Sequence, residues 1–303
     1  MGLSRRDILI GAPGVAAGYL TAKVLADTRG PTDRRGFRIA HLTDVHILPK
    51  RGPEKSFAEA LEHAQGRGAE LIINGGDAIM DASDTKMSLV ETYWSAYNRI
   101  LKEHNSLPVI NVLGNHDVFG WSSRDRRVEF KAEALQRLGL EKPYYSLEKA
   151  GWKLIVLDSI AWAPERPRGY KADLGLDQQQ WLTAELESTK LPTCVISHIP
   201  ILSACAFFDG PNEETDDWTV PGAWMHLDAR ALNDLFSKHP QVKLCLSGHI
   251  HLVDSVRFGR VEYFCDGAVS GYYWKGPYQG FGPGYALVDL LPDGSYRHEM
   301  VYY

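Results

Sequence analysis

Short apolar runs alternate with amphipathic stretches from Phe37 to the end of the chain. The stretch 56–65 is typical, because its apolar residues recur every three or four positions and would share one face of a helix. The same spacing predicts helices at 56–65, 87–103, 126–138, 177–187 and 228–237. The apolar runs predict strands at 37–42, 71–73, 109–113, 144–147, 152–157, 194–196, 242–246, 252–257, 261–265, 285–290 and 296–302.

The order of these elements indicates an α/β fold. Helices that alternate with strands pack on the faces of a sheet, and the run of strands after residue 252 adds antiparallel pairing. No internal repeat or low-complexity linker divides the sequence, so one domain is expected over 35–303. Two segments, 160–173 and 201–221, lack clean periodicity, and long loops of this kind are usually functional or disordered.

The composition is that of an ordinary globular chain. Hydrophobic residues make up 44% and charged residues 23% of the 303 residues, which excludes a disordered, collagen-like or multi-span membrane protein. The net charge of −5 gives no electrostatic footprint for general nucleic-acid binding. The four cysteines are scattered and form no C-x-x-C pair, so no disulfide scaffold is expected.

The first 26 residues differ from the rest of the chain. Arg5 and Arg6 precede an apolar run at 8–22, which is too short and too rich in glycine for a transmembrane helix. Val24 and Ala26 then place small residues where a signal peptidase reads. The order Ser-Arg-Arg-x-x-Leu resembles a twin-arginine export signal.

This resemblance implies a signal peptide at 1–26 and the twin-arginine export machinery as a partner. The protein would then be exported, to the periplasm or the exterior of a bacterium. Whether the segment is cleaved or kept as an anchor stays open, and no stable membrane span is expected from it. The alternative is an ordinary basic N-terminus of a cytosolic protein.

Polar residues cluster directly after five of the predicted strands. Short turns at strand ends are where α/β proteins build sites, because a rigid sheet holds the turns in place. In chain order the blocks are Asp44-Val45-His46, Gly75-Gly76-Asp77, Gly114-Asn115-His116-Asp117, Ser197-His198 and Gly248-His249-Ile250-His251.

The side chains of these blocks supply oxygen and imidazole ligands without a thiolate. This mixture suits Zn, Mn or Fe. The ligands are too many for one tetrahedral site, and they fit two metal ions that share a carboxylate and keep positions open for water. Two metal ions roughly 3.5–4 Å apart stabilise the attacking and leaving oxygens in phosphate-ester hydrolysis.

Together the five blocks are similar to the D-x-H, G-D, G-N-H-D/E, H and G-H-x-H pattern of the calcineurin-like metallophosphoesterase superfamily. The resemblance spans residues 37 to about 290. It implies a four-layer αββα sandwich, with two mixed β-sheets flanked by helices. His46 is unlike the purple acid phosphatase branch, which has glycine there. The family's G-D-x-x-D spacing is one residue longer here, so it assigns no role to Asp81.

The resemblance also implies a role for each block. One metal ion would be held by Asp44, His46 and His251, and the other by Asn115, His198 and His249, with Asp77 bridging the two. His116 would protonate the leaving oxygen or steady the phosphoryl group, and the neighbouring carboxylate of Asp117 would keep its imidazole protonated. A metal-activated water would be the nucleophile.

The substrate stays open at this point. The D-x-H branch includes cyclic-nucleotide and glycerophosphodiester enzymes, which favours phosphodiesterase over phosphomonoesterase activity by analogy. The other alternative is a non-catalytic scaffold of the same fold, although such relatives usually lose metal ligands or the G-N-H histidine, and this chain keeps all of them.

An aromatic segment follows the last block. Tyr272 and Trp274 would offer stacking surfaces to a ring of the substrate, and Lys275 would offer charge to its phosphate. An edge loop that covers apolar surface is the equal alternative.

Overall fold

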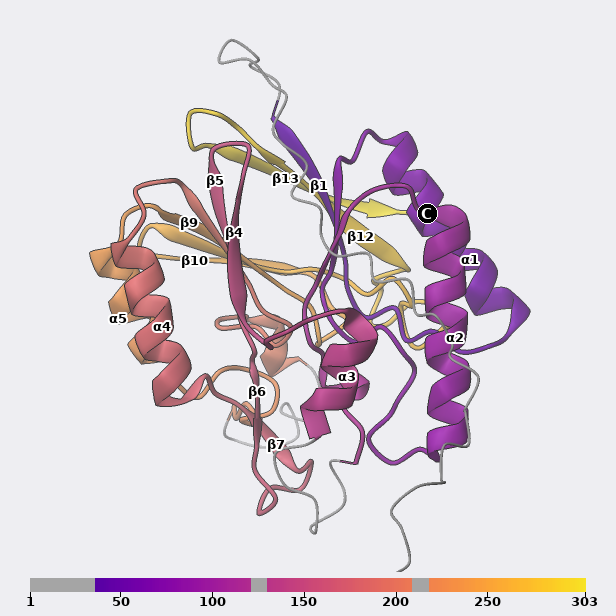
Figure 1. Ribbon diagram of the computed structural model, residues 1–303. Helices are drawn as coiled ribbons and strands as arrows, with labels where there is room; N and C mark the ends of the chain where they lie inside the picture. Colours follow the sequence, from indigo (N-terminus) through magenta and orange to yellow (C-terminus); the bar gives the residue numbers. More distant parts are fainter. Residues whose placement is uncertain (1–35, 121–129, 209–217) are drawn as a thin grey trace, which may run out of the picture.

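Two β-sheets lie face to face between two layers of helices (Figure 1). The structure, a computed structural model, describes residues 36–120, 130–208 and 218–303. The predicted signal peptide at 1–26 lies outside the described residues, as do the first four positions of the helix predicted at 126–138. The predicted α/β sandwich of two mixed sheets flanked by helices is confirmed.

The first sheet has parallel strands at its centre and antiparallel strands on one side. Its order is β13 (Tyr296–Tyr302), β12 (Gly284–Leu290), β1 (Phe37–Leu42), β2 (Leu71–Asn74) and β3 (Val109–Asn111). β1, β2 and β3 are parallel, so their carboxyl ends meet at one edge. The C-terminal strand pair β12–β13 closes the sheet beside β1 in antiparallel register.

The second sheet has the same character. Its order is β10 (Asp254–Phe258), β11 (Val261–Cys265), β9 (Val242–Ser247), β8 (Thr193–Ile196), β5 (Trp152–Val156) and β4 (Tyr145–Lys149). The four central strands are parallel, and β10 and β4 pair antiparallel at the two edges. The carboxyl ends of β8 and β9 therefore lie together, as those of β1, β2 and β3 do.

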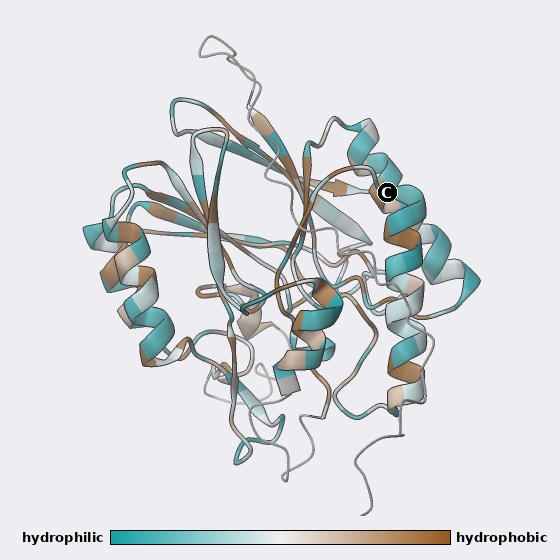
Figure 2. Cartoon of the chain, in the orientation of Figure 1, coloured by the Kyte–Doolittle hydropathy of each residue, from teal (hydrophilic) through white to brown (hydrophobic). Residues whose placement is uncertain are grey.

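Helices cover the outer face of each sheet (Figure 1). α1 (Arg51–Gly66) and α2 (Met87–His104) lie on the first sheet, and α4 (Gly175–Glu187) and α5 (Ala229–Lys238) lie on the second. The remaining helices are α3 (Phe130–Leu138) and two short 3-10 turns, η1 (Asn115–Asp117) and η2 (Cys205–Phe207). In Figure 2 the helices carry both hydrophilic and hydrophobic residues, as expected for elements that pack on one side only.

Alternation along the strands separates the core into three layers. Side chains of one parity fill the space between the sheets, with contributions from both, such as Ile39 of β1 and Leu154 of β5. Side chains of the other parity face outward: Leu42 meets α1 and α2, and Val195 meets α4 and α5. This period-two pattern is what fixes each sheet in its layer.

Two local predictions were wrong. α1 begins at Arg51 instead of 56, because Pro53 falls in the first turn, where its missing N–H costs no hydrogen bond. The segment 160–173 is not irregular, because it forms a hairpin of β6 (Ile160–Trp162) and β7 (Tyr170–Ala172). Strands of three residues are too short to show periodicity in the sequence.

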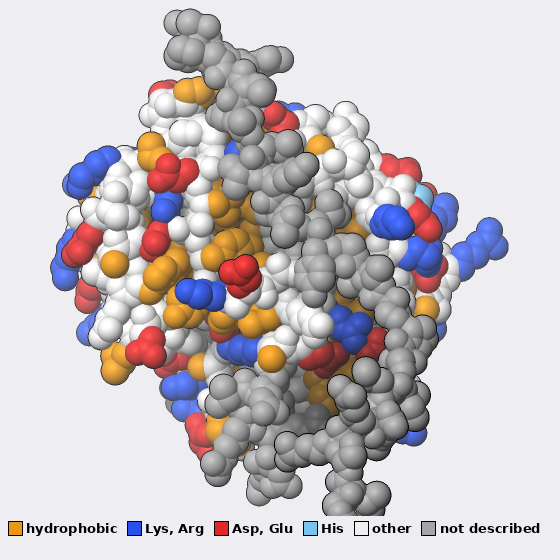
Figure 3. Space-filling view, in the orientation of Figure 1, with side chains coloured by type: hydrophobic (Ala, Val, Ile, Leu, Met, Phe, Trp, Pro, Cys, Tyr) orange, Lys and Arg blue, Asp and Glu red, His pale blue; other side chains and the backbone are white. Residues whose placement is uncertain are grey.

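The described surface mixes charges of both signs. On the face drawn in Figure 3, lysine and arginine side chains are interspersed with aspartate and glutamate side chains. No helix within the described ranges is long and apolar enough to cross a membrane.

The layer between the sheets should carry much of the stability. Leu154 is completely buried there, so Leu154→Ala should lower the free energy of unfolding by about 2–5 kcal/mol through lost burial and a cavity. Leu176 on α4 is 75% exposed, and Leu176→Ala should change it by less than about 0.5 kcal/mol. Urea denaturation of both variants measures the change in the free energy of unfolding. Equal midpoints for the two variants would contradict the placement of Leu154 in the layer between the sheets.

Candidate metal centre

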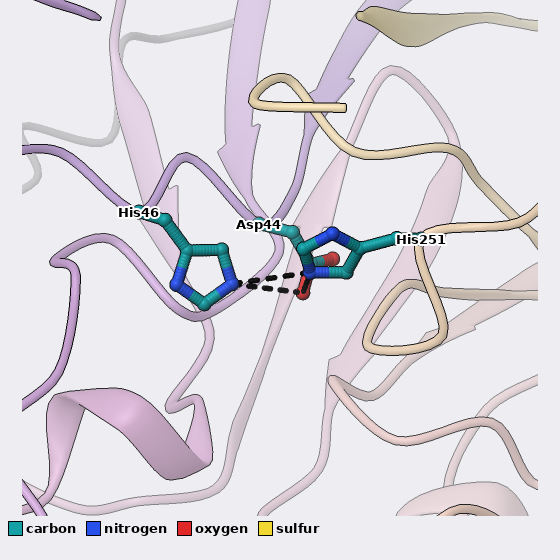
Figure 4. Close-up of side chains that lie close together, drawn as sticks. All are labelled: Asp44, His46 and His251. Atoms are coloured by element: carbon teal, nitrogen blue, oxygen red, sulfur yellow. Dashed lines mark hydrogen bonds and ion pairs between the residues drawn. The ribbon is translucent and has the colours of Figure 1, made fainter. Parts of the chain in front are cut away.

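Three buried side chains form a first group at the carboxyl end of β1 (Figure 4). The Nε2 atoms of His46 and His251 lie 3.1 Å apart. Asp44 Oδ1 lies 3.3 Å from Nε2 of His251 and 3.8 Å from Nε2 of His46. The sequence places His251 about two hundred residues from Asp44, and the strand order of the two sheets brings them together.

A second group forms around His198, which follows β8. Its Nε2 atom lies 3.1 Å from Asp77 Oδ2, 3.2 Å from Asn115 Oδ1 and 3.3 Å from His249 Nδ1. Asp77 follows β2, Asn115 opens η1 after β3, and His249 follows β9. Two oxygen and two nitrogen ligand atoms therefore converge from four strand ends.

Asp77 connects the two groups. Its Oδ2 atom, which faces His198, also lies 3.7 Å from Nε2 of His46 in the first group. The structure thus brings together all seven residues that the sequence predicted as metal ligands, with Asp77 between the two sets.

Hydrogen bonds to backbone carbonyls orient the imidazoles. The Nδ1 atom of His251 lies 2.7 Å from the carbonyl of Gly271, and that of His198 lies 2.9 Å from the carbonyl of Gly75. An Nδ1–H that donates to a carbonyl leaves the Nε2 lone pair for a metal ion, which is the usual arrangement of metal-binding histidines.

The converging atoms present lone pairs to one another, an arrangement that a cation between them would stabilise. Asp44 Oδ1 is buried, and no donor among the described residues makes a hydrogen bond to it. It faces two Nε2 atoms, and one of these belongs to His251, whose Nδ1 is positioned to hold the ring proton. Buried lone pairs that face one another are costly unless a positive charge lies between them. The residues present therefore fit two metal ions of the kind that nitrogen and oxygen ligands prefer, such as Zn, Mn or Fe.

The charge states of the histidines support this. Burial lowers the pKa of His46 and of His249 to about 3, so both imidazoles are neutral and able to bind a metal ion. Burial acts in the same direction on His198, but the carboxylate of Asp77 outweighs it and raises the pKa of His198 to about 9. A metal ion that binds His198 must displace this proton.

The backbone at the ligands is strained. Five of the seven ligand residues have left-handed φ angles between 46° and 72°, namely Asp44, His46, Asp77, His249 and His251. Residues other than glycine rarely adopt this conformation, and each costs of order 1–3 kcal/mol. Such strain persists only where the surrounding structure enforces it, and here it turns each ligand toward the centre.

Each ligand carboxylate uses its second oxygen to fix a neighbouring turn. Asp44 Oδ2 accepts the backbone N–H of His249 at 2.8 Å, and Asp77 Oδ1 accepts that of His116 at 2.7 Å. A Cβ atom at Gly248 would collide with Asp44 Oδ2, so only glycine permits this approach.

Asp117 holds neighbouring turns together. The sequence predicted that its carboxylate keeps the His116 imidazole protonated, and the structure gives that contact to a different carboxylate. The buried carboxylate of Asp117 accepts the backbone N–H groups of Asp77 at 3.0 Å, Ala78 at 2.8 Å and Gly114 at 2.9 Å. The carboxylate that contacts His116 is that of Asp81, whose Oδ1 atom lies 3.1 Å from Nδ1 of His116. The family spacing gave no reason to choose Asp81, because one extra residue separates it from Asp77.

His116 lies at the edge of the first group. Its partly buried ring is 4.9 Å from the ring of His46. Burial would lower the pKa of His116, but Asp77 and Asp81 outweigh it and raise the pKa above its ordinary value. Two carboxylates therefore favour the protonated imidazole that a general acid needs.

The aromatic segment reaches the centre through a residue that the sequence analysis passed over. The ring of Tyr273 lies 4.6 Å from the ring of His46 and 4.8 Å from that of His251. Trp274 donates its Nε1–H to the carbonyl of His46 at 3.0 Å. Tyr272 is exposed and stacks on Tyr278, with the Lys275 ammonium 5.4 Å above its ring. The one sequence signal for Tyr273 is its position between Tyr272 and Trp274, which the sequence suggested as stacking surfaces for the substrate.

Two curated relatives are each 24% identical to this chain. One is a probable cyclic nucleotide phosphodiesterase of Synechococcus sp., matched over 280 residues that cover 88% of this chain and 93% of the relative. The other is a 3′,5′-cyclic-nucleotide phosphodiesterase of Nostoc sp., matched over 279 residues that cover 85% and 89%.

Solved structures share the fold. A dimetal phosphatase from Danio rerio superposes with a TM-score of 0.63 at 14% identity and covers 89% of this chain and 99% of its own. A purple acid phosphatase from yellow lupin (Lupinus luteus) superposes with a TM-score of 0.59 at 13% identity, over 88% of this chain and 51% of its own. The family model of the calcineurin-like phosphoesterases matches residues 37–253, the segment that contains all seven candidate ligand residues. The chain therefore belongs to the calcineurin-like phosphoesterase family.

Proposed function

We propose that this protein hydrolyses phosphodiesters, cyclic nucleotides among them, at the site formed by the two ligand groups. The observation that carries the proposal is the sharing of Asp77 between the groups, with His116 bound to the same carboxylate through its backbone N–H. This arrangement places one ionisable side chain beside a site for two cations, and both features can assist phosphoryl transfer to water.

Residues that follow strands of both sheets would hold the cations. Asp44, His46 and His251 would hold one ion and Asn115, His198 and His249 the other, with Asp77 between them. When bound, the two ions supply Lewis acidity to a phosphoryl group and to a water molecule.

His116 supplies the proton. Its Nδ1–H donates to Asp81, so its Nε2–H is left to donate to the leaving oxygen when the P–O bond breaks. Asp81 fixes the ring orientation and opposes loss of the proton, and the hydrogen bond from the His116 backbone to Asp77 fixes the Cα position. His116 then regains a proton from solvent, to which a quarter of its side chain is exposed.

The choice of phosphodiesters rests on the relatives and is supported by the site. Both curated relatives bear the names of cyclic nucleotide phosphodiesterases and match most of this chain. A diester has a poor alkoxide leaving group that needs a proton, and His116 with Asp81 provides one. The other candidate activity, on phosphomonoesters, would use the same ligands.

We also propose that the chain is exported by the twin-arginine machinery, to the periplasm or the exterior of a bacterium. The support is the Ser-Arg-Arg-x-x-Leu order with the weak apolar run that follows it. That route carries folded proteins, so the buried metal site could be filled before export.

The metal-loaded protein should hydrolyse bis-p-nitrophenyl phosphate and 3′,5′-cyclic AMP faster than p-nitrophenyl phosphate. Removal of metal with a chelator should abolish turnover and lower the melting temperature, because ions that bind only the native state stabilise it. Steady-state assays and thermal unfolding with Mn, Zn or Fe added back test both effects. No hydrolysis of any ester with any of these ions would refute the proposal, and a strong monoester preference would reverse the choice of substrate.

His116→Ala should lower kcat about 100- to 10,000-fold, the usual contribution of a general acid, while metal content stays unchanged. Asp81→Asn should lower kcat about 10- to 100-fold, because it loosens the ring and weakens its hold on the proton. His104→Ala is the matched control, since His104 pairs with Glu62 at the surface. Wild-type rates in His116→Ala would remove its role, as would loss of metal from that variant.

The double change Arg5→Lys and Arg6→Lys should prevent export, because the twin-arginine receptor reads the guanidinium pair. Cell fractionation of a bacterial host that expresses the full chain measures this. Normal delivery of the double variant across the membrane would exclude the twin-arginine route.

A further inference from the structure

Two cysteines and an aspartate form a third group of metal-ligating side chains, apart from the seven ligands of the proposed centre. Within the described ranges, one ligand atom each from Cys205, Asp254 and Cys265 lies within 4.8 Å of the other two. Cys205 opens η2, Asp254 begins β10 and Cys265 ends β11. The proposed mechanism uses none of the three, and a pair of thiols selects softer metal ions than the ligands of the centre do.

The pairing of two strands brings Asp254 and Cys265 together. β10 and β11 are antiparallel, and Asp254 is the partner of Cys265 in their register. Residues directly opposed in an antiparallel pair project their side chains to the same face, with Cβ atoms about 4.5–5.5 Å apart. Backbone hydrogen bonds therefore make the carboxylate and the thiol neighbours, and a substitution of either side chain leaves those bonds in place.

The carboxylate of Asp254 also holds the segment that carries Cys205. Its Oδ2 atom accepts the backbone N–H of Cys205 at 2.7 Å and the hydroxyl of Ser203 at 3.1 Å. The Ser203 hydroxyl in turn lies 2.9 Å from the sulfur of Cys205. These contacts bring the Cys205 thiol to the same place as the Cys265 thiol, although sixty residues separate the two in the sequence.

The other oxygen of Asp254 has no such support. Oδ1 is buried, and no donor among the described residues makes a hydrogen bond to it. A buried carboxylate oxygen without a donor is costly, because it has lost water and gained no partner in exchange. A cation between the carboxylate and the two sulfur atoms would supply the missing positive charge. This oxygen distinguishes the group from two cysteines that merely pack as small apolar side chains.

An apolar shell surrounds the two thiols. Cys205 and Cys265 share a buried cluster with aliphatic side chains, and larger side chains pack against this cluster from outside. The aliphatic members are Ala206, Ile250 and Leu252, and the outer side chains are Val220, Trp224, Tyr278 and Phe281. A shell of this kind limits the access of water, which would otherwise compete with the protein for a bound metal ion.

The group adjoins the last block of proposed ligands. Ile250 stands between His249 and His251 in the sequence and packs in the cluster of the two cysteines. The Cys265 thiol donates to the carbonyl of Gly248 at 3.3 Å. An ion held by the two sulfur atoms would therefore brace the turn after β9, which carries two of the proposed ligands of the centre.

We propose that Cys205, Asp254 and Cys265 form a zinc site that fixes η2 to β10 and β11. Zn²⁺ suits the set because it accepts thiolate and carboxylate ligands together and is usually four-coordinate in structural sites. The Ser203 hydroxyl, which already contacts two of the three ligands, takes the fourth position. Binding releases one proton from each thiol to solvent, so one Zn²⁺ and two S–H groups give two Zn–S bonds and two protons.

Cobalt in place of zinc distinguishes this site from the proposed centre. The full chain, purified with a reductant and loaded with Co²⁺, should show a sulfur-to-cobalt charge-transfer band, which nitrogen and oxygen ligands alone do not give. Cys205→Ala and Cys265→Ala should each lose the band and bind one cobalt ion fewer per chain. Cys245→Ala is the matched control, because Cys245 is also buried but lies between the second sheet and its helices.

Two further measurements do not depend on the folding of the alanine variants. X-ray absorption by the zinc-loaded wild-type chain should show sulfur neighbours at about 2.3 Å from zinc. Asp254→Asn keeps both thiols, and it should raise the Co²⁺ concentration at which half of the band develops by at least about tenfold. A loss of that size is already known for groups that only support a metal ligand.

A wild-type chain with neither the charge-transfer band nor sulfur neighbours around zinc would overturn the proposal. So would a band that survives in Cys265→Ala, or one that is lost equally in folded Cys245→Ala. A disulfide between Cys205 and Cys265 that forms although zinc is present, detected in the mass of the denatured chain, would also overturn it. A chain that shows the sulfur signals but hydrolyses no ester would instead refute the proposed function alone.

Discussion

The metal centre depends on hydrogen bonds between buried carboxylates and the backbone N–H groups of neighbouring turns. Asp44 binds the turn after β9, Asp77 binds the turn after β3, and Asp117 binds the turns after β2 and β3. Apart from the bond between Asp117 and Gly114 of its own turn, these bonds join strand ends that lie 39 to 205 residues apart in the sequence. A buried carboxylate would be costly without them, so the same bonds that solvate the charge also fix the ligands.

The strain at the ligands follows from this constraint. A left-handed residue directs its side chain away from the path of the strand, and at Asp44, His46 and His251 the redirected side chains meet at one point. The cost is met by the two sheets, whose shared apolar layer and parallel strands hold the turns in register. The free energy gained by packing the two sheets therefore maintains the strained backbone conformation of the ligand residues.

The chemistry of the site is divided among its side chains. The two ligand groups bring together lone pairs that a cation would stabilise. Beside them, His116 and Asp81 share a proton. The ring of Tyr273, from the turn at 271–276, packs against the imidazoles of His46 and His251. This division places charge stabilisation and proton transfer on different side chains of the site.

The sequence by itself determined the order of elements and the chemistry. The bounds of β1 and β11 follow from their apolar residues, and the five polar blocks specify oxygen and imidazole ligands at strand ends. Only the tertiary structure decided which carboxylate serves His116, which aromatic side chain covers the ligands, and that 160–173 is a hairpin. The physical reason is that left-handed turns and contacts between segments distant in the sequence set side-chain directions, and neither leaves a periodic trace in the sequence.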